Sequence, residues 1–435
     1  MTDQQKRMVD EVRAELAADV AMAAGAPDAA EARLPEPPSR FVYLDYAATA
    51  PLCEEAALAM APFQVPGPAN LAVNANANAL YGLGREAFDL MENARRRAAR
   101  ALGARRPDEI VFTSGATEAD NAALYGLVAG AREVLRKSGR GAAPVHVITT
   151  AIEHDAVLAP ARRLAAEGVQ VTYLAPNRDG FIEASALEAA LTEHTVLVSV
   201  QMANSEVGAI QPIAELARLA HKGGALFHTD AVQALGKTPV DVSALDVDAA
   251  SFSAHKIGGP KGVGALYLRA RTPFDAFMLG GGQEAGRRSG TQNVAGIEGF
   301  AAALEAAVAA AEDESARLRA LRDALYAEVL PMDGIQATVD VEAGSRDFLP
   351  NIVHLLSDDL ESETMVLRFD QLGFCVAGGS ACSSHSLEPS HVLKAMGITG
   401  DEAYNALRVS MGRYTTDDDI ARFTEALRKV LAWNS

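Results

Sequence analysis

The sequence predicts an α/β fold built on a mostly parallel sheet. From Phe41 onward, short apolar runs alternate with helical patterns, and strands separated by helices are typical of parallel sheets. Several runs end directly in polar residues, at the position where such sheets bind ligands. The chain has 435 residues, more than one core usually holds, so two domains are expected.

The expected strands are short apolar runs bounded by polar or turn residues. They are Ile110–Thr113, Val145–Thr149, Val169–Leu174, Val196–Gln201, Ala225–His228, Ala249–Ser253 and Gly264–Leu268. A long helical stretch at about Val294–Val329 leads into a second domain. That domain is expected to hold strands at Ile352–Leu356 and Arg408–Ser410 and a closing helix at Asp417–Leu431. Residues 1–40 form an extension, with a helical pattern followed by a linker rich in Ala and Pro.

Composition excludes several classes of protein. The net charge of −18 argues against binding nucleic acid or an anionic membrane, but is compatible with a basic partner protein. Three cysteines give no disulfide framework and fit a reducing compartment. Charged residues throughout Met1–Asp19 exclude a signal peptide, and the apolar stretch Gly296–Ala311 is too short and too charged to span a bilayer. The expected location is the cytoplasm.

One lysine stands out because it follows an apolar strand and precedes a glycine-rich turn. The chain has eight lysines, and Lys256 lies beside Ser253 and His255 in this setting. Desolvation and nearby positive charge lower the pKa of a lysine and allow it to form an imine with an aldehyde cofactor. Ser253 and His255 can donate hydrogen bonds to a phosphate. Taken alone, a solvated loop lysine is the commoner interpretation.

Three further segments strengthen this interpretation. Ala116 and Thr117 open a helix after a strand, where backbone N–H groups bind phosphate. Asp230 follows another strand and can pair with a protonated pyridine nitrogen, while Gln233 can bond the ring's phenolic oxygen. His154 follows a third strand and can stack on the ring and move protons near neutral pH. Each segment alone has a structural explanation as a helix cap or a packed residue, but together they are specific.

In this order and spacing, the segments resemble the class V aminotransferase group of fold-type I pyridoxal 5′-phosphate (PLP) enzymes, and specifically the IscS/NifS-type cysteine desulfurases. The resemblance runs from about Tyr43 to Leu431. Besides the segments above, it includes Tyr43–Ala48, Arg288–Thr291, Gly379–Ser384 with Leu387–Ser390, and Arg408–Arg413. The Ser-Ala-Cys sequence at Cys382 is the most diagnostic, because it separates desulfurases from aminotransferases of the same fold.

The resemblance implies a role for each residue. Lys256 holds PLP and removes the Cα proton of L-cysteine, His154 stacks on the ring and helps protonate intermediates, and Cys382 takes the sulfur as a persulfide. Arg408 binds the substrate carboxylate. Thr291 reaches the phosphate of the other subunit, so a homodimer with shared active sites is implied. The residues implied in contacts with PLP are Ala116, Thr117, His154, Asn204, Ser205, Asp230, Gln233, Ser253, His255, Lys256 and Thr291.

The sequence departs from the family pattern at two places. Ser205 stands where a second asparagine is usual, so either Ser205 or Asn204 is expected to contact PLP. Around Asn76, which is expected on the substrate side, Tyr81 replaces the usual histidine. No metal is expected, because the spacing of Cys375, Cys382 and His385 fits no standard zinc pattern.

The implied architecture is that of the aspartate aminotransferases. A large PLP-binding domain at about 56–310 carries a seven-stranded, mostly parallel sheet, and a small α/β domain combines 41–55 with 311–435. The implied reaction converts L-cysteine to L-alanine and passes persulfide sulfur to an acceptor or scaffold protein, for iron–sulfur cluster assembly or tRNA thiolation. The alternatives are a selenocysteine lyase, a C–S β-lyase or an aminotransferase of this fold, or a catalytically silent scaffold.

Overall fold

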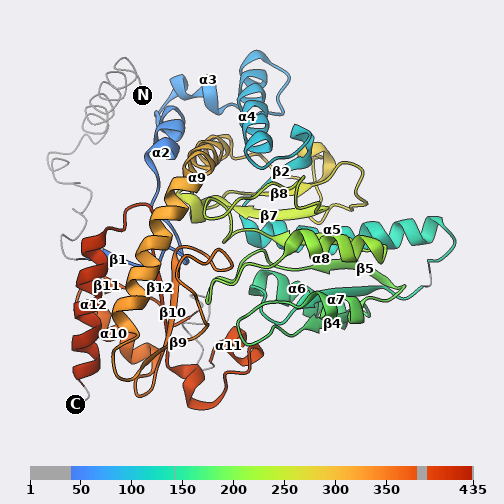
Figure 1. Ribbon diagram of the computed structural model, residues 1–435. Coiled ribbons are helices and arrows are strands. Elements are labelled where there is room, and N and C mark those ends of the chain that lie inside the picture. The colour runs from blue at the N-terminus through green and yellow to red at the C-terminus, as the bar shows by residue number, and fades with distance from the viewer. Residues whose placement is uncertain (1–40, 142, 380–388, 434–435) are drawn as a thin grey trace.

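The structure is a computed structural model that describes residues 41–141, 143–379 and 389–433. Residues 1–40, with their expected helix and linker, lie outside the described residues, as do Cys382 and His385. Figure 1 shows a central sheet with helices on both faces, beside a second group of strands and helices near the C-terminus.

The central sheet has seven strands, as expected, in the order β2-β8-β7-β6-β5-β3-β4. Its strands are β2 (Ile110–Thr113), β3 (His146–Thr150), β4 (Gln170–Leu174), β5 (Thr195–Ser199), β6 (Leu226–Asp230), β7 (Ala249–Ser253) and β8 (Gly264–Leu268). Strand β8 is antiparallel to both of its neighbours, and all the other pairs are parallel. The α/β class and the mostly parallel sheet are therefore confirmed, and the carboxyl ends of six strands share one edge.

Helices cover both faces of this sheet because alternate strand residues point to opposite sides. Val111 and Leu266 pack with α5 (Ala116–Lys137) and α6 (Asp155–Ala166) on one face. Phe112 and Phe252 belong to a second cluster on the other face. That cluster includes residues of α4 (Gly82–Ala101), α8 (Ile213–Lys222) and the first part of α9 (Val294–Val329). The remaining helices of this part of the chain are α2 (Glu54–Met60), α3 (Leu71–Asn74) and α7 (Ala184–Ala190).

A separate core is built mainly from C-terminal residues (Figure 1). Its antiparallel sheet has β10 (Ile352–Ser357) between β9 (Ile335–Ala337) and β12 (Ala406–Ser410). Strand β1 (Val42–Tyr43) pairs in parallel with β11 (Phe374–Cys375), which attaches the start of the described chain to this core. The helices of this part are α10 (Ser362–Gln371), α11 (His391–Ala395) and α12 (Asp417–Ala432).

Helix α9 connects the two cores. Phe300 and Leu304 belong to the core of the central sheet, whereas Leu318 and Leu325 belong to the C-terminal core. The expected boundary at 310–311 falls between these groups but inside one continuous helix. We therefore propose that α9 is shared by the two domains, whose bounds otherwise remain as predicted.

The length of α9 contradicts one expectation from the sequence, which concerns the apolar stretch Gly296–Ala311. The apolar stretch was expected to be too short for a bilayer, but it folds within a helix of 36 residues that is long and apolar enough to cross one. Half of its most apolar window is nevertheless buried within the protein, where it packs against α2 and α4. A core helix meets the same criteria of length and composition, so α9 by itself is weak evidence for a membrane span.

Candidate active site

The candidate site lies at the carboxyl edge of the central sheet. Asp230 ends β6, Ser253 ends β7, and Glu153 and His154 follow β3 closely. Because these strands run parallel, the chain brings residues far apart in sequence to a single edge.

Lys256 lies in a short 3₁₀ helix, Ala254–Ile257, immediately after β7. Its ammonium group donates to the main-chain carbonyls of Ala47 and Ala48 at 2.5 and 2.8 Å. The segment after β1 therefore orients the lysine, as Ala50 N also bonds His255 O at 2.9 Å. The motif Tyr43–Ala48 thus contributes main-chain carbonyl groups that bind the lysine. The types of its side chains do not reveal this role.

Asp230 is 9% exposed and accepts a hydrogen bond from Val232 N at 2.9 Å. Burial raises the pKa of its carboxyl group, while that hydrogen bond and the nearby charges of His154 and Lys256 oppose the rise. Asp230 therefore lies close enough to His154 and Lys256 for their charges to act on its carboxyl group.

Two further buried carboxyl groups lie near Asp230. Burial raises the pKa of Glu153 to about 8, although one of its oxygens accepts from Thr150 Oγ1 and Gln201 N, both at 2.8 Å. Burial also raises the pKa of Asp120 well above its usual value, and the charge of Asp230 adds to this rise. Sequence reasoning missed both residues as members of the site, because only their burial beside Asp230 distinguishes them.

The N-terminus of α5 forms the second wall of the site. Gly115 caps the helix with φ +155°, and nothing lies within 4 Å of the position that an added Cβ would take there. Gly264, at the start of β8, lies so close that an added Cβ would be 2.7 Å from Gly115 Cα. Thr117 is exposed, whereas Ser253 is only 4% exposed.

His255 lies on the other side of Lys256 and is half-buried. Its Nδ1 is 3.1 Å from Thr49 Oγ1. Burial, followed by the charges of Lys256, Lys261 and Lys237, lowers the pKa of His255 to about 4. The imidazole is therefore neutral at pH 7 and carries a single N–H, whose position on the ring depends on the tautomer.

His154 caps α6, and its Nδ1 accepts from Ala156 N at 3.1 Å. In the tautomer that makes this bond, the ring carries a proton on Nε2. His154 and Ser205 line the same small cavity of about 30 Å³. Asn204 is buried, and its side chain is bonded to main-chain atoms of Ile152, Glu206 and Val207.

Arg408 and Gln233 also lie among buried groups. Arg408, on β12, is 2% exposed and donates to Ser205 O at 2.9 Å and to Asp45 Oδ1 at 2.8 Å. Its buried Nε has no hydrogen-bond partner among the described atoms. Gln233 donates to Ala47 O at 3.0 Å, and its buried Oε1 is likewise without a partner in the described part of the chain.

Asn76 and Thr291 lie in segments that contact each other. Both residues are exposed, and Asn78, whose main chain bonds Asn76 Oδ1, donates to Gln292 Oε1 at 2.8 Å. The segment before Thr291 reaches the first turn of α5, where Arg288 pairs with Glu118 at 2.7 Å. These contacts leave the side chains of Asn76 and Thr291 on the surface.

Comparison with known proteins identifies the family. Residues 42–423 match the family described as Aminotransferase class-V. The cysteine desulfurase IscS of Dictyoglomus turgidum is 41% identical over 392 residues, covering 90% of this chain and 95% of that protein. The cysteine desulfurase IscS of Klebsiella pneumoniae is 42% identical over 381 residues, covering 87% and 90% of the two chains.

Solved structures agree with this assignment. A structure titled as a NifS-like protein matches with a TM-score of 0.80 at 35% identity and covers 90% of this chain and all of its own. A structure of SspA in complex with cysteine matches with a TM-score of 0.71 at 32% identity, covering 86% and 99%. Together with the geometry above, these matches show that the chain belongs to the class-V aminotransferase family and, within it, to the IscS/NifS-type cysteine desulfurases.

Proposed function

We propose that this chain converts L-cysteine to L-alanine with PLP bound at Lys256, and that Cys382 receives the sulfur as a persulfide. The observation that carries the proposal is the convergence of Lys256, Asp230 and the N-terminus of α5 at one edge of the sheet. Cysteine desulfurases and class-V aminotransferases are PLP enzymes, and this edge offers the groups that such a cofactor needs.

The residues present fit PLP in their chemistry. The open N-terminus of α5, with Ser253 and neutral His255 nearby, suits a phosphate group. Buried Asp230 suits a ring nitrogen that carries a proton, and the Gln233 amide would bond the phenolic oxygen after exchanging its contact with Ala47. When bound, PLP supplies an electron sink for negative charge that develops at the substrate Cα.

Each of the chain's own residues then has a separate role in the reaction. The Lys256 amine removes the proton from the substrate Cα and returns a proton during product formation. The buried Asp230 carboxylate would keep a proton on the ring nitrogen of the bound cofactor. His154, with its proton on Nε2, is oriented by Ala156 N and helps to protonate the product. Either Ser205, beside His154, or Asn204 contacts the phenolic oxygen as well.

Arg408 holds the substrate carboxylate. Its planar fork matches a carboxylate, and its buried unpartnered Nε supports a ligand at this position. Asp45 and Ser205 O orient the guanidinium from the other side. Asn76 is proposed to contribute from the substrate side of the site.

Cys382 carries out the sulfur transfer. Its thiolate attacks the sulfur of the substrate, an S–S bond forms, and the substrate Cβ–S bond breaks as its electrons return to the carbon skeleton. Protonation of that skeleton gives alanine. The persulfide then passes to an acceptor or scaffold protein in the cytoplasm, for iron–sulfur cluster assembly or tRNA thiolation, and the net charge of −18 suits a basic acceptor.

The test is to supply L-cysteine and measure alanine, sulfide and pyruvate together, in the wild type and in Cys382→Ala. The wild type should form alanine and a persulfide on the peptide that contains Cys382, and Cys382→Ala should retain PLP but form almost no alanine. Undiminished desulfuration by Cys382→Ala, or release of pyruvate with sulfide, would instead identify a C–S β-lyase. Borohydride reduction should attach PLP to the peptide containing Lys256, and attachment at Lys261 would contradict the assignment.

The functional unit is proposed to be a homodimer with shared sites. Large apolar side chains are exposed in the two segments that Asn78 and Gln292 join, including Leu80 at 90% and Leu279 at 81%. An exposed apolar surface of this kind is typical of an interface, and Thr291 lies in the same region. Mixed dimers of Lys256→Ala and Thr291→Ala subunits should regain activity, whereas a fully active monomer in sedimentation would exclude the shared site.

A further inference from the structure

A second lysine lies next to Lys256. Lys237 follows β6 in a tight turn, and Gly236 before it has φ +72°. A Cβ at Gly236 would be 3.0 Å from Ala307 Cβ and 3.3 Å from Ile257 Cγ2, so the turn packs directly against α9 and against the residue after Lys256. Ser315 Oγ on α9 also donates to Lys237 O at 2.5 Å. The main chain of Lys237 is therefore held in place from two sides.

The side chain of Lys237 points toward the Schiff-base lysine. Lys237 is only 8% exposed, and its Nζ donates to Lys256 O at 3.5 Å, a long hydrogen bond. Both lysines line one cavity of about 140 Å³ between the two cores. A buried ammonium group usually has a carboxylate partner, because burial of an isolated charge is costly. Lys237 has none among the residues that the structure describes.

The other charged groups around the cavity are already engaged. Glu314 pairs with Arg317 at 2.7 Å, and Arg413 pairs with Glu55 at 2.8 Å. Neither acid therefore compensates Lys237. Besides the two lysines, the titratable and charged groups that line this cavity are Tyr46, Cys53, Glu314, Arg413 and Tyr414. Asp230 and His255 interact electrostatically with the lysines, and His154 and Lys261 act in turn on Asp230 and His255.

The two lysines affect each other's protonation because they lie close together in a buried site. Burial, and then the charge of Lys256, lowers the pKa of Lys237 to about 8. The interaction is reciprocal, because two positive charges in a site of low polarity disfavour each other equally. Asp230 acts in the opposite direction and favours the charged form of Lys256. Asp230 and the carbonyls of Ala47 and Ala48 thus favour the charged form of the Lys256 amine, and Lys237 opposes them.

We propose that Lys237 is a positioning residue that fixes the Lys256 segment and favours the neutral, nucleophilic form of the Lys256 amine. A neutral amine is required both to form the covalent link to an aldehyde cofactor and to accept the substrate Cα proton. The inference rests on the proposed role of Lys256, but it concerns the protonation of the Lys256 amine, which can be measured without any cofactor.

The test follows the lysine side chains by NMR in the full-length, cofactor-free protein labelled with ¹³C at lysine. Eight lysines give a simple spectrum, and each titration midpoint is read from the chemical shift against pH. Lys237→Met removes the charge at similar length and should raise the midpoint of Lys256 by about one pH unit. Lys237→Arg keeps the charge and should keep the midpoint low. Lys261→Met is the matched control, since it removes the same charge from an exposed residue nearby and should shift the midpoint much less.

An unchanged Lys256 midpoint in folded Lys237→Met, or an equal shift in Lys261→Met, would overturn the proposal. If Lys237→Met fails to fold, Lys256→Met supplies the reciprocal measurement, in which the midpoint of Lys237 must rise, and an unchanged value overturns the proposal equally. Because PLP is absent throughout, these results are independent of the proposed function. Borohydride attachment of PLP in the wild type tests that function separately.

Discussion

The buried ion pair between Arg95 and Glu284 offers a sharp test of the physical reasoning. Glu284 is held by both of its oxygens, which accept from Arg95 at 2.6 and 2.9 Å, and one of them also accepts from Phe112 N at 2.9 Å. The side chains of Glu284 and Arg95 are 1% and 7% exposed. The pair attaches the segment that leads to Thr291 to β2 and α4, and it holds Glu284 and Ala285 at φ +50° and +55°.

Glu284→Gln is a small change of side chain, but it should lower the free energy of unfolding strongly. The substitution leaves the Arg95 charge buried with less compensation, and breaking one partner of a buried pair costs about 3–5 kcal/mol. Arg95 still pairs with Glu92 at 2.8 Å, and Glu92 is partly exposed, so the loss should be near the lower limit, about 3 kcal/mol. Release of the unusual backbone conformation at Glu284 and Ala285 should also loosen the segment before Thr291.

Denaturant unfolding followed by circular dichroism at pH 7 measures this loss, at one protein concentration and with PLP at the same excess in every sample. The matched control is Glu133→Gln. Glu133 forms a similar two-oxygen pair with Arg136 at 2.7 Å, but the side chains are 43% and 67% exposed. Water and salt screen an exposed pair, so Glu133→Gln should barely move the midpoint. Equal shifts for the two variants would refute the argument that burial determines the effect.

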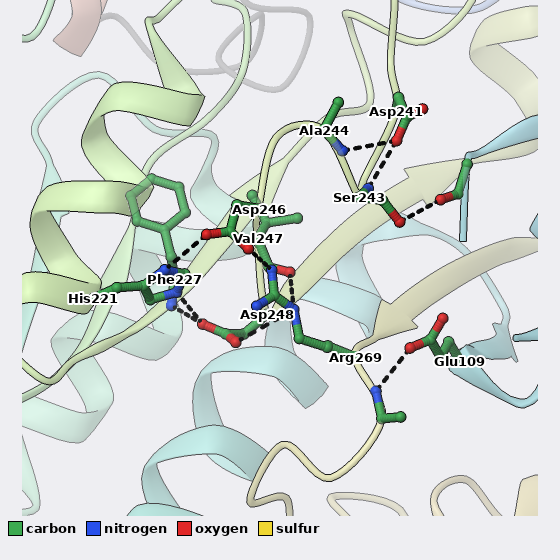
Figure 2. Close-up of polar contacts among 12 residues, drawn as sticks. Glu109, His221, Phe227, Asp241, Ser243, Ala244, Asp246, Val247, Asp248 and Arg269 are labelled. Atoms are coloured by element: carbon green, nitrogen blue, oxygen red, sulfur yellow. Dashed lines mark hydrogen bonds and ion pairs between the residues drawn. The ribbon is translucent and has the colours of Figure 1, made fainter. Parts of the chain in front are cut away.

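Three further predictions concern the opposite edge of the sheet, the phosphate wall and the substrate side. His221 is bonded to Asp248 at 2.8 Å. Figure 2 shows Asp246 and Arg269 beside them. The hydrogen bond to Asp248 outweighs burial, and the charges of Asp248 and Asp246 add to it, so the pKa of His221 is raised. Its contribution to stability is therefore fully present below its unfolded pKa and is lost as pH rises through the folded pKa. The pKa of an unfolded histidine is about 6.5. His221→Gln should therefore lower the free energy of unfolding more at pH 5.5 than at pH 8.5, with little change in kcat. A loss of stability that grows with pH would contradict the predicted pH dependence. Gly264→Ala should weaken PLP binding, measured by cofactor absorbance, because its Cβ would be 2.5 Å from Phe252 O and 2.7 Å from Gly115 Cα. Gly82→Ala, where the nearest atom would be 4.0 Å away, is the control, and equal PLP affinity in the two variants would contradict the close approach. Arg408→Lys should raise KM for L-cysteine by about tenfold or more, while the absorbance of bound PLP is retained. A lysine cannot keep the bonds to Asp45 and Ser205 and also bind a carboxylate with a planar fork. An unchanged KM would show that Arg408 does not bind the substrate.

Much of the fold was predictable because its signals are local. The strand Ala249–Ser253 and the helix Val294–Val329 were predicted with the bounds that the structure gives them, since apolar periodicity depends only on neighbouring residues. The convergence of Asp230 and Lys256 was also predictable, because parallel strands bring their carboxyl ends to one edge. Family resemblance then supplied roles that no pattern in this single chain could assign.

Other features depend on contacts between distant segments and so were decided only by the tertiary structure. Asp45 and Arg408 are 363 positions apart and meet because Asp45 lies beside β12. Asp120 becomes part of the site only through the packing of α5 under β6 and β7. Lys237 is 19 residues from Lys256, and in sequence it is an ordinary turn lysine. The sequence by itself determined where the strands and helices lie along the chain, with some ends displaced by one or two residues, because hydrophobic periodicity is local. Only the tertiary structure decided which charges are buried together, because burial depends on how the strands are ordered and on what α9 and α5 cover.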